Sequence, residues 1–321
     1  MPMLGRPMFR LVPDGTRIQF MRGRFLGLLT SAVLSTASII LFFYPGLRLG
    51  IDFRGGIVME VRTPGPADFG KIRAALAAAH VAQAGLQRFG SASEAIIRLD
   101  PQACEAGTQV AVGRVETALQ QAQPGTKVVR TDAVGASVSK QLFDNGLLAL
   151  GLSLLMILVY IWFRFEWQFA VGEVVTLILD ITKAIGFLVV TRLEFDLVMV
   201  AAILTILGYS TNDKVVVYDR MRENLRKYKT MPLRQLIDLS INETLNRTLG
   251  TSMTIFLASL PLALFGGPSL SGFALMMLFG IVVGTSSSVF IAAPILLFLG
   301  ENKLRRGTQA VAKPAKAPSR V

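Results

Sequence analysis

The chain contains a single cysteine, Cys104, and a single histidine, His80, in 321 residues. One cysteine excludes an intrachain disulfide framework and a cysteine-based metal site. The histidine stands in an alanine-rich stretch that is typical of a helix, and we assign it no catalytic or ligating role. The sequence also lacks a G-x-x-x-x-G-K-[ST] phosphate loop, which argues against a nucleotide as energy source. We therefore expect no metal, no cofactor and no enzyme activity.

Charged residues are scarce as well, at 17% of the chain, whereas 52% of the residues are hydrophobic and the mean hydropathy is +0.53. A soluble domain of ordinary composition is less apolar than this. Acidic residues are the scarcer sign, with 21 Asp and Glu against 33 Lys and Arg. Nucleic-acid binders share such a basic excess, but here it lies largely beside apolar runs. We predict an integral membrane protein in contact with lipid and without a nucleic-acid partner.

Six apolar runs approach or exceed the length of about 20 residues that a membrane-spanning helix needs. They are separated by turn signals and cover residues 25–44, 146–163, 168–190, 196–217, 248–265 and 270–299. The first run is longer than the apolar region of a typical signal peptide and lacks a small-x-small cleavage site, so we expect an uncleaved anchor. The pattern predicts a multi-pass α-helical membrane protein with six transmembrane helices.

The basic segments predict the orientation, because Lys and Arg in short loops stay on the cytoplasmic side. With six spans, the N-terminus (1–24), the loop 219–246 and the tail (300–321) all fall on one side, and all three are basic. We therefore expect both termini in the cytoplasm and residues 45–145 outside it. The tail is rich in Lys, Ala and Pro, a composition typical of disorder.

The outer segment is predicted to form a small α+β domain. Strand patterns cover residues 51–62, 87–90, 95–100 and 127–133, and helix patterns cover 68–80 and 110–121. This strand and helix order suggests a ferredoxin-like arrangement, with two helices over an antiparallel sheet.

Four motifs make the sequence specific. They are LGIDFRGG at 49–56, GYSTNDKVVVYDRMREN at 208–224, ETLNRTLGTSMT at 243–254 and GIVVGTSSSVFIAAP at 280–294. In this order, with six spans and one outer domain, the chain resembles the SecF proteins of the SecD/SecF family over nearly its whole length. That family is related to the resistance-nodulation-division exporters.

The resemblance implies a non-enzymatic subunit of the bacterial inner membrane. Such a subunit works with a SecD-like subunit and the SecYEG channel to help unfolded polypeptides cross, and the coupling ion is the proton. The resemblance implies that Asp213 and Arg247 belong to the proton pathway. Two positions depart from the usual pattern: Lys214 replaces a threonine, and Leu179 replaces a histidine before Asp180. The local charge balance around the motif is therefore expected to differ from that of relatives with the usual pattern.

Ionised side chains at membrane depth need a partner or a task, since each costs about 2.5 to 3.5 kcal/mol. Asp180 and Lys183 lie three residues apart on one helix face, so they either neutralise each other or take part in proton movement. Asp213 either carries the proton or pairs with Lys214 or Arg247 to hold helices together. We expect Lys214 to reach cytoplasmic water and, like Lys183, only to modulate the pathway. Glu173 is interpreted as structural.

Two further groups have structural or mechanical interpretations. Small residues suited to close helix packing are Gly208, Gly280, Gly284 and Ser287. At the boundary between the first span and the outer domain stand Asp52, Arg54, Gly55 and Gly56. The glycines permit unusual backbone angles, and the segment is either a rigid joint that transmits motion or a plain turn with a local ion pair.

Two other functions stay open from the sequence. One is a half-sized proton-coupled exporter of small molecules, although relatives of that kind usually join twelve spans and two outer domains in one chain. The other is a purely structural assembly factor.

Overall fold

In a computed structural model of the chain, residues 13, 16–79, 81, 84–88, 91–101 and 105–299 are described. His80, Cys104, most of the predicted N-terminal segment and the whole predicted tail 300–321 lie outside the described residues.

Six described helical segments are long and apolar enough to cross a membrane. Five are single helices: α1 (Arg24–Phe43), α5 (Ala136–Arg164), α6 (Trp167–Thr191), α7 (Leu197–Lys227) and α8 (Leu233–Phe265). The sixth runs through α9 (Gly267–Ser287), the π-helical segment η2 (Ser288–Ala292) and α10 (Ala293–Leu299). The number and order of the predicted spans are confirmed.

The helices are longer than the apolar runs that predicted them. α5 begins at Ala136 rather than near residue 146. α7 continues to Lys227, and α8 already begins at Leu233. The predicted loop 219–246 is therefore wrong as a loop, because it is mostly the ends of two helices. The prediction counted apolar residues, whereas a helix continues past the hydrocarbon with polar residues on its outer faces.

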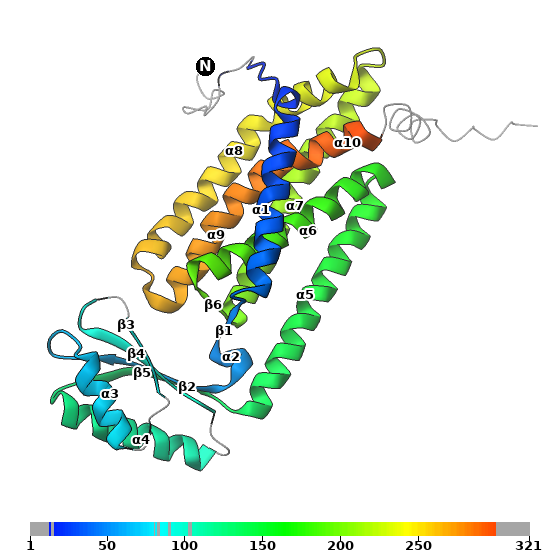
Figure 1. The fold of residues 1–321 in the computed structure, drawn as a ribbon. Coiled ribbons are helices and arrows are strands. Elements are labelled where there is room, and N and C mark those ends of the chain that lie inside the picture. The colour runs from blue at the N-terminus through cyan, green and yellow to red at the C-terminus, as the bar shows by residue number, and fades with distance from the viewer. Residues whose placement is uncertain are drawn as a thin grey trace, which may run out of the picture.

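The bundle is built around α7, which contacts α6, α8 and α9. α1 packs along α6, and α5 lies at the edge of the bundle (Figure 1). The start of α1, the α7–α8 connection and the end of α10 lie at one end of the helices, and the sheet domain lies at the other (Figure 1). The three predicted basic segments thus adjoin the same end.

Four antiparallel strands form the sheet between α1 and α5, in the order β3 (Gly85–Arg88), β4 (Glu94–Leu99), β2 (Gly56–Arg62) and β5 (Lys127–Val134). Helices α3 (Phe69–Ala78) and α4 (Glu105–Ala122) cover one face (Figure 1). Alternate residues of β2 and β4, including Met59 and Ile97, are fully buried beneath these helices, as period-two patterning requires.

One strand prediction was wrong at its start. Residues Ile51–Arg54 form the short helix α2, and the strand β2 begins only at Gly56. Gly55 ends α2 with φ of 74° and Gly56 follows with φ of 123°, angles that other residues rarely adopt. The glycine pair therefore changes the chain direction between the helix and the sheet.

Gly280 marks a close approach of α9 to α7, whereas Gly208 does not. A Cβ at Gly280 would overlap the Ile206 side chain, and one at Gly284 would lie 3.1 Å from Ser210. Apart from its chain neighbours and its own helix backbone, no described heavy atom lies within 4 Å of the Cβ that Gly208 would carry. Gly208 therefore marks no close contact within the described residues, and its predicted packing role stays a prediction.

We predict that Gly280→Ala lowers the free energy of unfolding by about 1 to 3 kcal/mol, because the added methyl group overpacks the α7–α9 contact. The matched change Gly208→Ala adds the same group to open space and should leave stability unchanged or slightly raised. Thermal unfolding of the purified protein in detergent measures both. Equal melting temperatures for the two variants would contradict this packing.

Candidate functional site: a buried polar layer

Charged and hydroxyl side chains from α6, α7 and the α9–η2 junction meet inside the helix bundle. We call this set the polar layer; its members are Glu173, Asp180, Lys183, Ser210, Asp213, Lys214, Ser287 and Ser288. Each member exposes at most 6% of its surface. Apolar clusters adjoin the layer on both sides, one around Phe169 and Tyr218 and one around Leu177 and Ile206. Along α7, the layer thus lies between apolar side chains.

Lys214 is the centre of the polar layer. Its Nζ donates hydrogen bonds to Asp180 Oδ2 at 3.0 Å and to Ser210 Oγ at 2.8 Å. Glu173 Oε1 lies 3.8 Å from the same nitrogen. The side chain is fully buried, so the prediction that Lys214 reaches cytoplasmic water was wrong, whereas its modulating role stays a prediction. It is the cation that joins α7 to α6.

Asp180 is held from three elements. Its Oδ2 accepts hydrogen bonds from Lys214, from Ser210 Oγ at 2.9 Å and from Ser287 Oγ at 2.9 Å. Lys183 Nζ lies 3.7 Å from Oδ1. The predicted pairing of Asp180 with Lys183 is therefore present, but it is the longer of two ion pairs. Three donors on one oxygen suit an ionised carboxylate.

Glu173 stands seven residues, or about two turns, before Asp180 on the same face of α6. It is fully buried, and neither carboxyl oxygen has a hydrogen-bond partner among the described residues. Glu173, interpreted from the sequence as structural, lies beside Lys214, and that interpretation stays a prediction. Its seven-residue spacing from Asp180 was the signal that could have found it.

Asp213 is buried, with 3% of its surface exposed. Its Oδ2 accepts a hydrogen bond from Ser288 Oγ at 2.6 Å. Ser288 is the first residue of η2, and such π-helical insertions are frequent at functional sites. Asp213 is thus tied to the irregular part of the sixth span.

Arg247 does not join this site. Its side chain is exposed on α8, and no ion pair joins it to another residue in the part of the chain that the structure describes. The expected contact between Arg247 and Asp213 is therefore absent from this arrangement. One polar link from α7 to α8 runs instead through Tyr209, whose hydroxyl bonds Ser252, and Ser252 bonds Thr285 of α9 at 2.8 Å.

The charges of the polar layer do not balance when all are ionised. Three carboxyl groups, on Glu173, Asp180 and Asp213, face two ammonium groups, on Lys183 and Lys214. A single added proton would make the layer neutral. Neutrality is favoured because a buried unpaired charge is strongly unfavourable. The arrangement suits the uptake and release of a proton.

Exposed ion pairs join the helices at the end opposite the sheet domain. Arg220 bonds Glu243 of α8 at 2.7 Å and Glu223 at 2.5 Å, and Arg164 of α5 bonds Asp219 at 2.6 Å. Arg220 and Glu223 are three residues apart on α7. Pairs with this exposure contribute little to stability individually, and their geometry fixes where α5, α7 and α8 meet.

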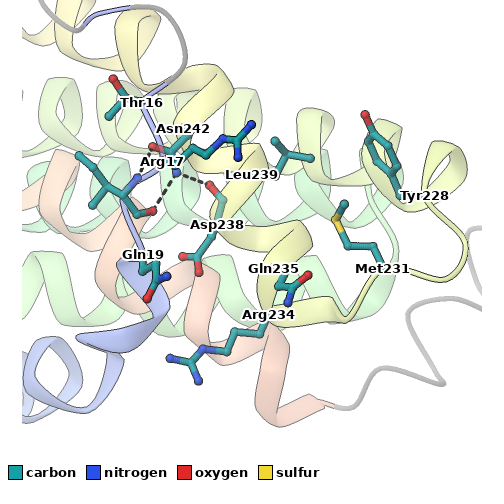
Figure 2. Close-up of a pocket in the computed structure, with 11 residues that line it drawn as sticks. Thr16, Arg17, Gln19, Tyr228, Met231, Arg234, Gln235, Asp238, Leu239 and Asn242 are labelled. Carbon is teal, nitrogen blue, oxygen red and sulfur yellow. Dashed lines mark hydrogen bonds between the residues drawn. The ribbon is translucent and has the colours of Figure 1, made fainter.

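A cleft at the same end lies between the chain before α1 and α8 (Figure 2). Asn242 holds the two together, accepting from the Ile18 backbone N at 3.0 Å and donating to the Ile18 backbone O at 2.9 Å. Asp238 Oδ1 accepts from the Met21 N at 2.8 Å. The cleft has no direct contact with the polar layer, and its hydrogen bonds anchor the start of the chain.

The junction with the sheet domain is built on the start of α7. Asp52 Oδ2 accepts a hydrogen bond from the Leu197 N at 3.0 Å, and Asp196 caps the same helix through the Met199 N at 2.8 Å. Burial raises the pKa of Asp196, and the Asp52 carboxylate adds to that rise, while the bond from Met199 opposes it. Arg54 is exposed and forms no ion pair with Asp52. Within the described residues, the local ion pair considered for this turn is absent.

Two further contacts fix this junction. β1 (Arg48–Leu49) pairs in parallel with β6 (Glu194–Phe195) between α6 and α7. Arg98 of β4 forms an ion pair with Glu194. The sheet domain is thus bonded directly to the turn that leads into α7, the helix that carries Asp213 and Lys214.

Fold and site define a membrane protein with six candidate spans, a buried layer of charged side chains and a sheet domain at one end of the bundle. The family model "Protein export membrane protein SecD/SecF, C-terminal" matches residues 114–302, and the "SecD/SecF GG Motif" model matches residues 40–63. The chain belongs to the SecD/SecF family of protein export membrane proteins, and it is a multi-pass membrane protein.

Relatives agree with this assignment. The protein translocase subunit SecF of Rickettsia akari is 42% identical over 295 residues, which cover 92% of this chain and 96% of the relative. The SecF of Rhodobacter capsulatus is also 42% identical, over 91% of each chain. Among solved structures, the translocon-associated SecDF of Thermus thermophilus matches with a TM-score of 0.80 and 30% identity. That match covers 91% of this chain and 40% of the longer SecDF chain.

We predict that Lys214→Met lowers the free energy of unfolding by about 3 to 5 kcal/mol, because it leaves buried carboxylates without their cation. Adding Asp180→Asn should recover part of the loss. Lys183→Met is the matched control and should have a smaller effect, since Lys183 forms only the 3.7 Å contact. Thermal unfolding in detergent measures all three, and a Lys214→Met variant as stable as the wild type would contradict the geometry.

Proposed function

We propose that the chain is a SecF-type subunit of the bacterial protein translocase. It works with a SecD-like subunit and the SecYEG channel, in the cytoplasmic membrane, to promote movement of unfolded secretory polypeptides driven by the proton gradient. It performs no enzymatic reaction and uses protons as its coupling ion. The 42% identity to SecF proteins over nearly the whole chain supports the assignment. The neighbouring SecDF chain, less than half of which this chain covers, supports a SecD-like partner.

In this proposal both termini are cytoplasmic and the sheet domain is periplasmic and ferredoxin-like. The positive-inside rule supports the orientation, because the three basic segments adjoin one end of the bundle. The strand order β3-β4-β2-β5, with both helices on one face, supports the ferredoxin-like assignment. A periplasmic domain is well placed to contact a polypeptide that emerges from the channel.

The single observation that carries the energy-coupling part is the burial of Asp213 and its bond to Ser288 at the π-helical segment. Protonation of Asp213 changes this bond from one made to a charged oxygen to one made to a neutral acid, which is weaker. The weaker Ser288–Asp213 bond then allows the sixth span to shift against α7. Because Asp52 and β1 are bonded to the α6–α7 turn and the start of α7, movement of α7 reaches the outer domain.

In this proposal, Arg247 approaches the polar layer in a second conformation of the chain. Its position on α8, four residues before Thr251 and five before Ser252, puts it near the α7–α8 contact. A proton cycle needs at least two arrangements whose free energies are close. The arrangement described here is the one in which Arg247 faces outward.

We predict that Asp213→Asn abolishes the stimulation of export by a proton gradient, because the amide cannot gain or lose the proton. The assay measures secretion into inner-membrane vesicles that contain the full chain with its SecD-like partner and the channel, with and without an imposed gradient. Asp219→Asn is the matched control, since Asp219 is a surface residue paired with Arg164.

Copurification with the SecD-like subunit accompanies this assay. Intact copurification with lost stimulation supports the proposal. Normal stimulation by Asp213→Asn would overturn the energy-coupling part and leave a structural assembly role.

A further inference from the structure

Glu173 differs from the other two acids of the polar layer in lacking a hydrogen bond of ordinary length among the described residues. Asp180 accepts from three donors and Asp213 accepts from Ser288. Neither oxygen of Glu173 makes a hydrogen bond of ordinary length among the described residues, its ion-pair contact with Lys214 is 3.8 Å long, and the side chain is fully buried. A buried carboxylate with such weak partners is unfavourable, so the neutral acid is the form that suits these surroundings.

The residues around Glu173 offer a place for one proton. Lys214, Asp180 and Asp213 are the charged groups that act on it. Thr211 and Tyr218 of α7 lie beside it, and the Thr211 hydroxyl is placed to donate to its carboxyl group. The other packed elements bring few ionisable groups: α9, η2 and α10 contain none, α1 contains Arg24, and α5 contains Lys140, Asp144, Tyr160 and Arg164.

Lys214 stands between two acids on one face of α6. Its Nζ is 3.0 Å from Asp180 Oδ2 and 3.8 Å from Glu173 Oε1, so a movement of less than one ångström equalises the two contacts. The flexible stem of a lysine permits this movement. While the ammonium is bonded to Asp180, a protonated Glu173 leaves the layer neutral. When Glu173 loses its proton, the ammonium is drawn toward it.

We propose that Glu173 is a second proton-carrying residue, and that Lys214 shifts between Asp180 and Glu173 as this proton leaves and returns. The proton adds to one carboxyl oxygen of Glu173 from water on one side of the membrane and leaves from that oxygen to water on the other. No covalent bond to carbon changes. The proposal rests on the proposed proton-driven function and adds the residue and the cation movement that accompany Asp213.

The shift of Lys214 has a structural consequence. Lys214 and Ser210 lie one turn apart on α7, and Asp180 also holds Ser287 at the end of α9. Loosening the Lys214–Asp180 contact therefore weakens the point where α6, α7 and α9 meet. Glu173 is coupled to the same helices as Asp213, but from the α6 side.

Glu173→Gln tests the proposal, because the amide mimics the neutral acid and cannot release a proton. In the vesicle assay with the full chain, its SecD-like partner and the channel, we expect this variant to copurify normally and to lose gradient stimulation. Glu166→Gln makes the same change at the residue that precedes α6, outside the layer, and should keep full stimulation. Normal stimulation by Glu173→Gln overturns the proposal.

The Asp213→Asn result separates the two proposals. Lost stimulation in Asp213→Asn with normal stimulation in Glu173→Gln removes only the role of Glu173. Normal stimulation in both variants removes proton coupling altogether.

A second measurement keeps the proposal falsifiable if Glu173→Gln fails to fold. The full wild-type chain, labelled with carbon-13 at its glutamate carboxyl groups, is reconstituted in lipid and measured by infrared spectroscopy at neutral pH. We expect an absorption of a protonated glutamic acid, which exposed glutamates do not give at that pH. The absorption should be lost as the pH is raised. Its absence at neutral pH and below, down to the range where exposed glutamates begin to protonate, overturns the proposal.

Discussion

The contact between Lys214 and Asp180, 3.0 Å long and removed from solvent, is the interaction on which the rest of the structure depends. A buried ion pair is weak support for stability in itself, since desolvation offsets its attraction. The geometry of the pair matters more than its strength, because it fixes the register between α6 and α7. Ser210 and Ser287 donate hydrogen bonds to the same Asp180 oxygen. Three spans are thereby joined at a single carboxylate.

The surroundings of that contact decide what it can do. Apolar clusters adjoin the polar layer on both sides, which keeps the local dielectric low and makes each charge in the layer costly unless it is matched. A low-dielectric layer with an odd number of charges responds strongly to one proton. The same helices carry that response to the sheet domain, because Asp52, β1 and Arg98 are bonded at the α6–α7 turn and the start of α7.

Periodicity and hydropathy were sufficient to predict the six spans and most strands of the outer domain. They could not predict that α7 and α8 continue through the basic segment, because charged residues there lie on helix faces that point to water or to each other, as Arg220 and Glu243 do. They also missed α2, since Ile51–Arg54 has an apolar pattern that a strand shares. The contacts of Asp52 and Phe53 with α7, β6 and α5, which favour the helix, come from residues far away in sequence.

The site was predictable only in part. Burial of Asp213 and the pairing of Asp180 with Lys183 follow from depth and spacing along a helix. The role of Lys214 depends on which face of α7 turns toward α6, and a lysine four residues after Ser210 gives no sign of that by itself. The most direct measurement is nitrogen-15 NMR of the Lys214 ammonium in lysine-labelled protein held in lipid nanodiscs, assigned with the Lys214→Met variant. We expect a charged ammonium whose protons exchange slowly with water and whose signal moves in Asp180→Asn; a rapidly exchanging signal that does not respond to Asp180→Asn would contradict the account.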